Sequence, residues 1–257
     1  MSTMSFFEKV WFLIEQYYPL FITGIAVTML IAMTGTVAGF LIGLVVGVVR
    51  TIPTSEHDSI IKRALLAVVR FICVAYIEIF RGTPMMIQAA VIYYGIFMGV
   101  DININIAAFA IVSINTGAYM AEIIRGGIIS IDKGQTEGAH SIGMTHRQTM
   151  TSVVLPQAIR NIMPSIGNEF VVNIKDTSVL NVIGVAELYF QSRSAAGTYA
   201  MFFQSFTIAA VIYFILTFTV TRILRLIERK MDGPKSYVIY GSQTNPAAEI
   251  HIDKGGV

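Results

Sequence analysis

Five apolar stretches separated by polar segments dominate the chain. They cover residues 20–49, 64–98, 102–124, about 162–183 and 201–220. Each can cross the ~30 Å hydrocarbon core of a bilayer, because a helix needs about 20 residues to do so. The pattern predicts an all-α membrane protein with five transmembrane helices within residues 20–230.

The second stretch is too long for one straight helix across a membrane, since a helix rises ~1.5 Å per residue. It contains the sequence FRGTPMMIQ at residues 80–88. In this sequence Gly82 loosens a helix, and Pro84 removes a hydrogen bond and crowds the preceding turn. We therefore expect a discontinuous helix with its break at this point.

Lysines and arginines are unevenly distributed over the segments that flank these stretches. The segments after the first, third and fifth stretches hold most of them. The segments before the first stretch and after the second and fourth hold only Lys9 and Arg193. Short loops rich in lysine and arginine stay on the cytoplasmic side. We expect the N-terminus outside and the C-terminus in the cytoplasm.

Composition agrees with a membrane location. The chain is 54% hydrophobic and 13% charged, with a mean hydropathy of +0.67, whereas a soluble domain is roughly 25% charged. A net charge of +2 gives no basis for a nucleic-acid partner. Cys73 is the single cysteine, so no internal disulfide can form. Four histidines are scattered without the spacing of metal ligands, and no catalytic constellation occurs.

The two ends of the chain lie outside the five stretches. Residues 1–19 are apolar but interrupted by Glu8, Lys9 and Glu15, which is typical of an amphipathic helix in the membrane interface and not of a cleavable signal. Residues 231–257 are polar, rich in turn formers and without periodicity. We expect them to form a flexible cytoplasmic tail.

Two adjacent residues of opposite charge, Lys175 and Asp176, lie inside the fourth stretch. Counting from Arg160 at ~1.5 Å per residue places Lys175 roughly 22 Å into the bilayer. A charge at that depth costs about 2.5–3.5 kcal/mol on insertion scales. Helical contacts form at spacings of three or four residues, where neither side chain meets an opposite charge. Each therefore needs a partner on another helix, on a second subunit or on a bound solute.

Adjacent opposite charges complement a free amino acid, which has an ammonium and a carboxylate within a few ångströms. Discontinuous helices expose backbone groups that transporters use to hold solutes, and Arg81 adds a cation suited to a carboxylate. The expected substrate-binding residues are Lys175, Asp176, Arg81, Thr83, Asn115 and Ser178. The alternative is a structural network in which Lys175 and Asp176 pair with fixed groups such as Glu78 and Arg81. Glu169 shares a helical face with Asp176 and is assigned, with Glu78, to this gate or network.

Two further features have structural interpretations. Gly35, Gly39, Gly43 and Gly47 recur at every fourth position, which lets another helix approach closely and predicts a packing face. Glu122 and Arg125 lie near the cytoplasmic end of the third stretch, where we expect them to anchor the loop that follows.

The longest polar region between the stretches covers residues 126–161. Its sequence EGAHSIGMTHRQTMTSVVLP predicts two short helices around a sharp turn at Gly143, the first beginning near Thr136 and the second ending near Leu155 and Pro156. These helices would form either a knob that fits a groove on another protein or an ordinary cytoplasmic loop. The residues alone leave both interpretations open.

This region resembles the signature loop of importer-type ABC-transporter permeases: Glu-Ala-Ala, three residues, Gly, nine residues, Ile, one residue, Leu-Pro. The matching positions are Glu137, Gly138, Ala139, Gly143, Val153, Leu155 and Pro156, with Gly138 and Val153 as departures. The sequences RGTPMMIQ, GAYMAEIIRGGI (117–128) and KDTSVLNVIGVAEL (175–188) resemble the polar amino-acid uptake permeases. The resemblance covers roughly residues 24–228.

The resemblance implies a transport subunit, not an enzyme, in a bacterial inner membrane. In that family the permease is one half of a transmembrane dimer, formed with a second copy or a related permease. An extracellular or periplasmic solute-binding protein delivers the amino acid, and two cytoplasmic ATP-binding cassette subunits drive transport. The residues implied to couple to the ATPase are Glu137, Gly138, Ala139, Gly143, Leu155 and Pro156. This chain would bind no cofactor; ATP and Mg would lie on the ATPase, because the sequence has no G-x-x-x-x-G-K-[ST] phosphate loop.

Two other functions are alternatives to this one. A secondary transporter or channel would use Lys175 and Asp176 as an ion relay, and a non-transporting assembly subunit would bind the ATPase without solute flux. The signature loop and the lack of a detectable internal inverted repeat count against the first.

Overall fold

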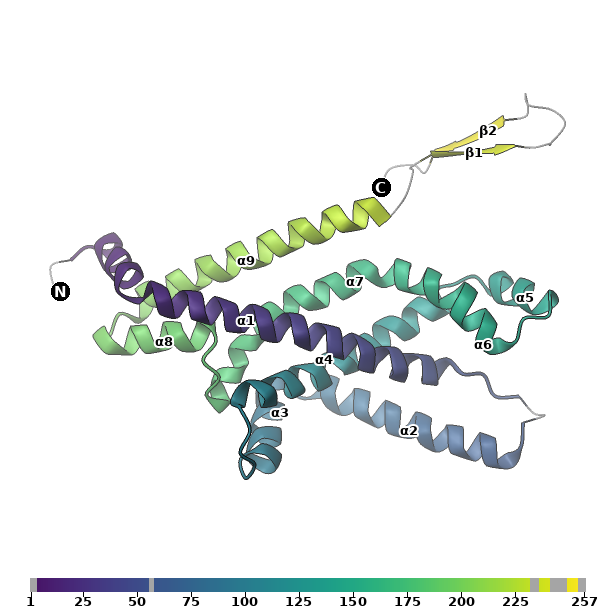
Figure 1. Cartoon of the computed structure of the whole chain (residues 1–257), viewed down its shortest axis with the longest axis horizontal. Helices are drawn as coiled ribbons and strands as arrows, with labels where there is room; N and C mark the ends of the chain where they lie inside the picture. Colours follow the sequence, from purple (N-terminus) through teal and green to yellow (C-terminus); the bar gives the residue numbers. More distant parts are fainter. Residues whose placement is uncertain (1–3, 56–57, 232–235, 241–248, 254–257) are drawn as a thin grey trace.

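The computed structural model describes residues 4–55, 58–231, 236–240 and 249–253 (Figure 1). The α-helices are α1 (Phe6–Thr51), α2 (Ile60–Gly82), α3 (Met85–Ile92), α4 (Ile104–Ile129), α5 (Lys133–Ser141), α6 (His146–Thr149), α7 (Leu155–Asp176), α8 (Leu188–Tyr199) and α9 (Phe202–Met231). Two π-helical segments, Tyr93–Phe97 and Met150–Val154, and one 3₁₀ segment, Thr177–Ile183, continue α3, α6 and α7. Figure 1 shows α1, α2, α7 and α9 along the length of the molecule, with α5 and α6 at one end and α8 at the other.

The first helix is one continuous element of 46 residues. It begins at a capping box, in which the Ser5 hydroxyl accepts from the Glu8 backbone and the Glu8 carboxylate accepts from the Ser5 backbone. The expected interfacial helix is therefore not a separate element, because α1 continues through Pro19. The first turns bend away from the rest of α1 (Figure 1), and the hydrogen bond that Pro19 lacks gives a reason for the bend. The location of this segment at a membrane interface stays a prediction.

The glycine repeat of α1 packs against α4, as the sequence predicts. Gly35, Gly39, Gly43 and Gly47 are all buried. A Cβ atom on Gly39 would stand 2.7 Å from the Cβ of Thr116, closer than two carbons can pack. The absence of side chains on this face of α1 is what lets the two helices approach closely.

The predicted break in the second apolar stretch is confirmed. Helix α2 ends at Gly82, Thr83 adopts an extended conformation, and α3 begins after Pro84. The fourth stretch differs from the prediction, because α7 ends at Asp176 and the chain continues as a 3₁₀ segment to Ile183.

A buried apolar cluster in the middle of the molecule joins the elements that follow the two helix ends. Ile31 of α1, Ala89 of α3, Ile111 of α4 and Leu180 of the 3₁₀ segment belong to it. The backbone irregularities after α2 and α7 therefore adjoin a common core.

Among the residues that the structure describes, three helices are long and apolar enough to cross a membrane: α1, α4 and α9. Helices α2 and α7, with 23 and 22 residues, have the length but not the composition, because α2 carries several charged side chains and α7 combines charged with uncharged polar ones. Five spans and their orientation therefore stay a prediction.

The C-terminal tail contains two strands that the all-α prediction did not include. Strand β1 (Ser236–Tyr240) pairs antiparallel with β2 (Glu249–Asp253), so that Ser236 lies opposite Asp253. The remaining tail residues, 232–235, 241–248 and 254–257, lie outside the described residues. The predicted flexibility of the tail stays untested.

Candidate substrate site at two helix ends

Buried amides hold the break between α2 and α3 in a defined geometry. The Gln88 side-chain amide donates to the carbonyls of Phe80 and Thr83, each at 2.9 Å. These carbonyls lie at the end of α2, where the helix no longer supplies partners. The Asn115 amide of α4 donates to the Gln88 side-chain oxygen at 2.8 Å. The side-chain amides of Gln88 and Asn115 thus hold the break in place and provide hydrogen-bond partners for the Phe80 and Thr83 carbonyls.

Three of the predicted substrate-binding residues are polar and uncharged, and two of them belong to this network. Asn115 is buried, and its amide also reaches the Phe80 carbonyl at 3.4 Å. The Thr83 hydroxyl donates to the Ile79 carbonyl at 2.7 Å and accepts from Gln88. Ser178 lies partly buried in the 3₁₀ segment. Whether any of the three contacts a substrate stays a prediction.

The charged candidates lie on α2 and α7. Lys175 and Asp176 occupy the last turn of α7, with Lys175 exposed and Asp176 partly buried. Arg81, in the last turn of α2, stacks its guanidinium over the Tyr119 ring at 5.5 Å. Glu169, two turns before Asp176, has Asp176 and Arg81 as its electrostatic neighbours. Arg81 is therefore an electrostatic neighbour of the acidic side of α7.

The expected interhelical ion pairs are not formed within the described part of this chain. The ion pairs there join Arg50 and Arg125 to Glu122, and Lys62 to Asp58. Among the same residues, none is formed by the five charged candidates Lys175, Asp176, Arg81, Glu78 and Glu169. The lock proposed as the alternative to a substrate site is thus absent from this conformation of the single chain. Asp176 also stands at a helix C-terminus, where the helix dipole disfavours a carboxylate.

One turn before Asp176, a buried amide fixes α7 to two other helices. Asn173 donates to the Thr36 hydroxyl of α1 at 2.8 Å and accepts from the Thr116 hydroxyl of α4 at 3.1 Å. Asn173 is 3% exposed. Although it shares a helical face with Asp176, its side chain is engaged between helices and holds the end of α7 in place.

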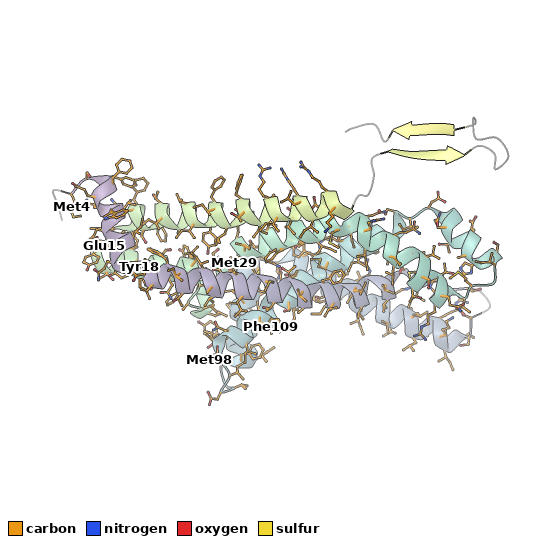
Figure 2. The ribbon with its side chains drawn as sticks, turned by 45° about the horizontal axis from the view of Figure 1, so that its top comes forward. Met4, Glu15, Tyr18, Met29, Met98 and Phe109 are labelled. Carbon is orange, nitrogen blue, oxygen red and sulfur yellow. The ribbon has the colours of Figure 1, made fainter. Side chains whose placement is uncertain are left out.

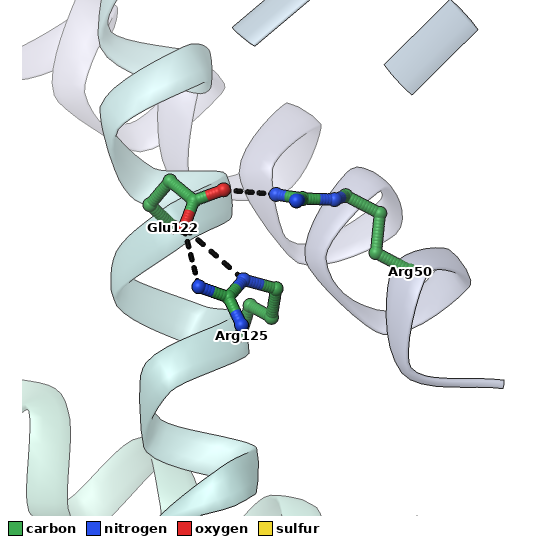
Figure 3. Close-up of polar contacts among 3 residues, drawn as sticks. All are labelled: Arg50, Glu122 and Arg125. Atoms are coloured by element: carbon green, nitrogen blue, oxygen red, sulfur yellow. Dashed lines mark hydrogen bonds and ion pairs between the residues drawn. The ribbon is translucent and has the colours of Figure 1, made fainter. Parts of the chain in front are cut away.

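At the other end of α4, Glu122 joins two arginines (Figure 3). Its carboxylate accepts from Arg125 at 2.8 Å and pairs with Arg50 in the last turn of α1. This arrangement agrees with the expected anchoring role of Glu122 and Arg125, and it adds Arg50. The cluster ties the end of α1 to the helix that leads into the following loop.

The loop after α4 forms two short helices around Gly143. Helix α5 ends at Ser141, and Gly143 adopts a left-handed backbone with φ of 84°, which favours glycine. Helix α6 follows and passes through the π-helical segment directly into α7. The second helix therefore does not end at Leu155 and Pro156 as expected. Pro156 lies in the first turn of α7, where proline is tolerated.

The implied coupling residues lie on both parts of this loop. Glu137, Gly138 and Gly143 are exposed, and Ala139 is buried. Leu155 is partly buried and Pro156 exposed at the start of α7. The exposed surface of α5 and its turn is thus available for contact with another protein; the docking role itself stays a prediction.

Residues 59–233 match the family described as "Binding-protein-dependent transport system inner membrane component". The chain belongs to this family. It is 35% identical over 226 residues to the glutamine transport system permease protein of Escherichia coli, covering 86% of this chain and 97% of that protein. It is 32% identical over 217 residues to the arginine transport system permease protein of Bacillus subtilis, covering 84% and 94%. The resemblance inferred from the signature loop is confirmed.

Two solved structures of ABC transporters share the fold. An amino acid ABC transporter crystallised with histidines superposes with a TM-score of 0.74 at 37% identity, covering 89% of this chain and 99% of that chain. An inward-facing methionine ABC transporter superposes with a TM-score of 0.65, covering 83% and 98%; its 20% identity supports the fold alone.

Sequence reasoning missed Gln88, Tyr119, Thr36 and Thr116 as parts of this region. A glutamine inside the apolar run MMIQAAVI was a usable signal, because a buried amide needs partners. The other three required the helix packing.

Proposed function

We propose that this chain is the membrane-spanning permease subunit of an ATP-driven importer that moves a polar amino acid into a bacterial cell. The curated relatives named above are transport permeases for glutamine and arginine. The uneven distribution of lysine and arginine favours five spans with the N-terminus outside. Transport proceeds by alternating access: the site opens first to the outside and then to the cytoplasm.

The observation that carries the substrate site is the group of charged side chains beside the two helix ends that form no ion pair among the described residues. Asp176 supplies a carboxylate for the ammonium group of an amino acid, and Arg81 or Lys175 supplies a cation for its carboxylate, while Glu169 belongs to the gate or network beside them. Opposite charges held at membrane depth without partners are unfavourable. An amino acid bound between them offsets that cost, which gives the site affinity for a zwitterion.

The partners follow from the same proposal. A solute-binding protein delivers the amino acid, and a second permease subunit completes the pathway. Two ATPase subunits, which hold ATP and Mg, dock on the exposed surface from Glu137 to Gly143. The family description itself names dependence on a binding protein.

Uptake by the assembled complex tests the proposal. The chain is reconstituted in vesicles with its ATPase and binding protein, and ATP-dependent uptake of labelled amino acids is measured. We expect Asp176→Asn to lower uptake at least about tenfold with the complex still assembled, which is the loss of about 1.4 kcal/mol of binding. Asp101→Asn removes the same charge from an exposed loop position and serves as the control.

Three outcomes contradict parts of this proposal. Unchanged uptake by Asp176→Asn would remove Asp176 from the site. Uptake driven by an ion gradient without ATP would favour the secondary transporter. ATPase docking without uptake of any amino acid would favour an assembly subunit.

A further inference from the structure

The outward face of α9 changes from apolar to cationic along its length. The side chains of Val211, Phe214 and Phe218 on this face are 51%, 65% and 47% exposed. Arg222, Arg225 and Arg229 follow at steps of three or four residues and are exposed as well. Residues at these spacings lie on the same side of a helix. These six residues therefore form one continuous stripe, here called the α9 stripe.

The α9 stripe faces away from the other helices. On the opposite side of α9, Leu224 packs against Gly167 of α7, where a Cβ atom would stand 3.2 Å from the Leu224 side chain. Ile208 and Ala209 are buried. Figure 2 shows nitrogen-bearing side chains standing out from the second half of α9 on the side turned away from the bundle.

The three arginines have no acidic partner among the described residues. Ion pairs in that part of the chain form elsewhere, at Glu122 and Asp58. Arg222 instead places its guanidinium over the ring of Phe218, 4.7 Å from the centroid. This contact lies where the apolar part of the stripe ends, and aromatic rings beside cations are typical of a membrane interface.

We propose that the α9 stripe is a lipid-binding face whose arginines bind the phosphate groups of anionic phospholipids. The guanidinium group matches the geometry of phosphate and binds it with two hydrogen bonds. Basic clusters just beyond a membrane helix attract the anionic lipids of the cytoplasmic leaflet. Acyl chains contact the apolar half of the stripe and the phosphates contact the cationic half.

The apolar half distinguishes a lipid from a soluble protein partner. An acidic surface of a cytoplasmic protein would complement the arginines but would not reach Phe214 and Phe218. Ile223 and Leu226, between the arginines, are 52% and 65% exposed. Apolar and cationic side chains interleaved in this way fit the interface between acyl chains and headgroups better than an aqueous surface.

Lipid retention by the purified complex tests the proposal. The complex is exchanged into micelles containing phosphatidylglycerol and phosphatidylcholine with identical acyl chains, and native mass spectrometry counts each bound lipid. We expect preferential retention of phosphatidylglycerol. Arg222→Gln, Arg225→Gln and Arg229→Gln should each weaken it about fivefold, the equivalent of roughly 1 kcal/mol per cation. Arg147→Gln makes the same substitution at an exposed position of α6, away from the α9 stripe, and should leave the preference unchanged.

Each contrary result overturns the proposal. The first is equal retention of both lipids by the unsubstituted complex, and the second is an unchanged preference in all three arginine variants. The third is release of the ATPase from the arginine variants with the lipid preference intact, which would assign the stripe to a protein partner. Because no uptake is measured, these results do not depend on the identity of the transported solute.

Discussion

The side-chain amide of Asn173 donates a hydrogen bond to the Thr36 hydroxyl at 2.8 Å, across 137 residues of sequence. This bond and the one from Thr116 hold α7 against α1 and α4 within one turn of Asp176. The position of the α7 charges therefore depends on a neutral residue one turn away, whose side chain bonds to other helices.

Replacing this amide should loosen the end of α7. Asn173→Leu removes both hydrogen bonds, and polar contacts between membrane helices are worth about 0.6–2 kcal/mol each. We expect a lower melting temperature of the detergent-solubilised permease and slower uptake. Asn168→Leu, at an exposed position of the same helix, is the matched control. Equal melting temperatures for the two variants would contradict the role of the bridge.

The glycine face of α1 should not tolerate a methyl group. Gly39→Ala places a Cβ atom 2.7 Å from the Thr116 Cβ, so α1 and α4 must separate. Overpacking of this kind costs about 1–3 kcal/mol. Gly126→Ala, where no atom lies within 4 Å of the added group, is the control. The thermal unfolding of both variants checks this prediction. A Gly39→Ala permease as stable as the unsubstituted one would mean that α1 and α4 approach less closely at Thr116 than the structure shows.

The Gln88 side-chain amide holds the break between α2 and α3 in place. Although it carries no charge, we expect transport to depend on it. Gln88→Leu leaves the Thr83 carbonyl without its donor, leaves the Phe80 carbonyl only the longer bond from Asn115, and deprives Asn115 of its acceptor. Each unsatisfied buried group costs about 1–3 kcal/mol. We expect uptake to fall at least about tenfold, measured as rate against amino-acid concentration. Gln16→Leu, exposed on α1, should leave uptake unchanged. Normal uptake by Gln88→Leu would show that the break does not need this network.

The turn at Gly143 gives a test of the proposed ATPase docking. Gly143→Val forces a branched side chain into a left-handed conformation, which costs roughly 1–2 kcal/mol or more. We expect weaker association with the ATPase, measured by co-purification. Gly138→Ala, in the exposed helix α5, restores the alanine of the family signature and should bind at least as well. Equal loss in both variants would indicate misfolding of the loop and not a role of the turn.

The sequence predicts those parts of the fold in which a local pattern of residues favours one structure over the others. Glycines at every fourth position permit a close helix contact, and that contact is present between α1 and α4. Pro84 interrupts a helix that is too long for a membrane, and the break is present. The signature loop predicts a turn at Gly143, which the left-handed backbone bears out.

The remaining features depend on contacts between distant residues. Nothing in the sequence from Lys175 to Gly184 resembles a helix terminator before Gly184, yet α7 ends at Asp176 because the following segment packs against α3. Pro156 was expected to end a helix, but the same residue is tolerated where α7 begins. Side-chain pairing was the least predictable property. Glu78 and Arg81 were considered as partners for Lys175 and Asp176, and the structure forms its ion pairs at Glu122 and Asp58.

The unbroken course of α1 has a mechanical consequence. At ~1.5 Å per residue its 46 residues span about 70 Å, more than twice the thickness of a hydrocarbon core. Its last turn is bound to α4 through Arg50, and near its beginning Leu13 packs with Leu188 of α8. Because both ends of α1 are held in this way, we expect a displacement at its Arg50 end to be passed along the helix toward Leu13, with Pro19 at the bend between them.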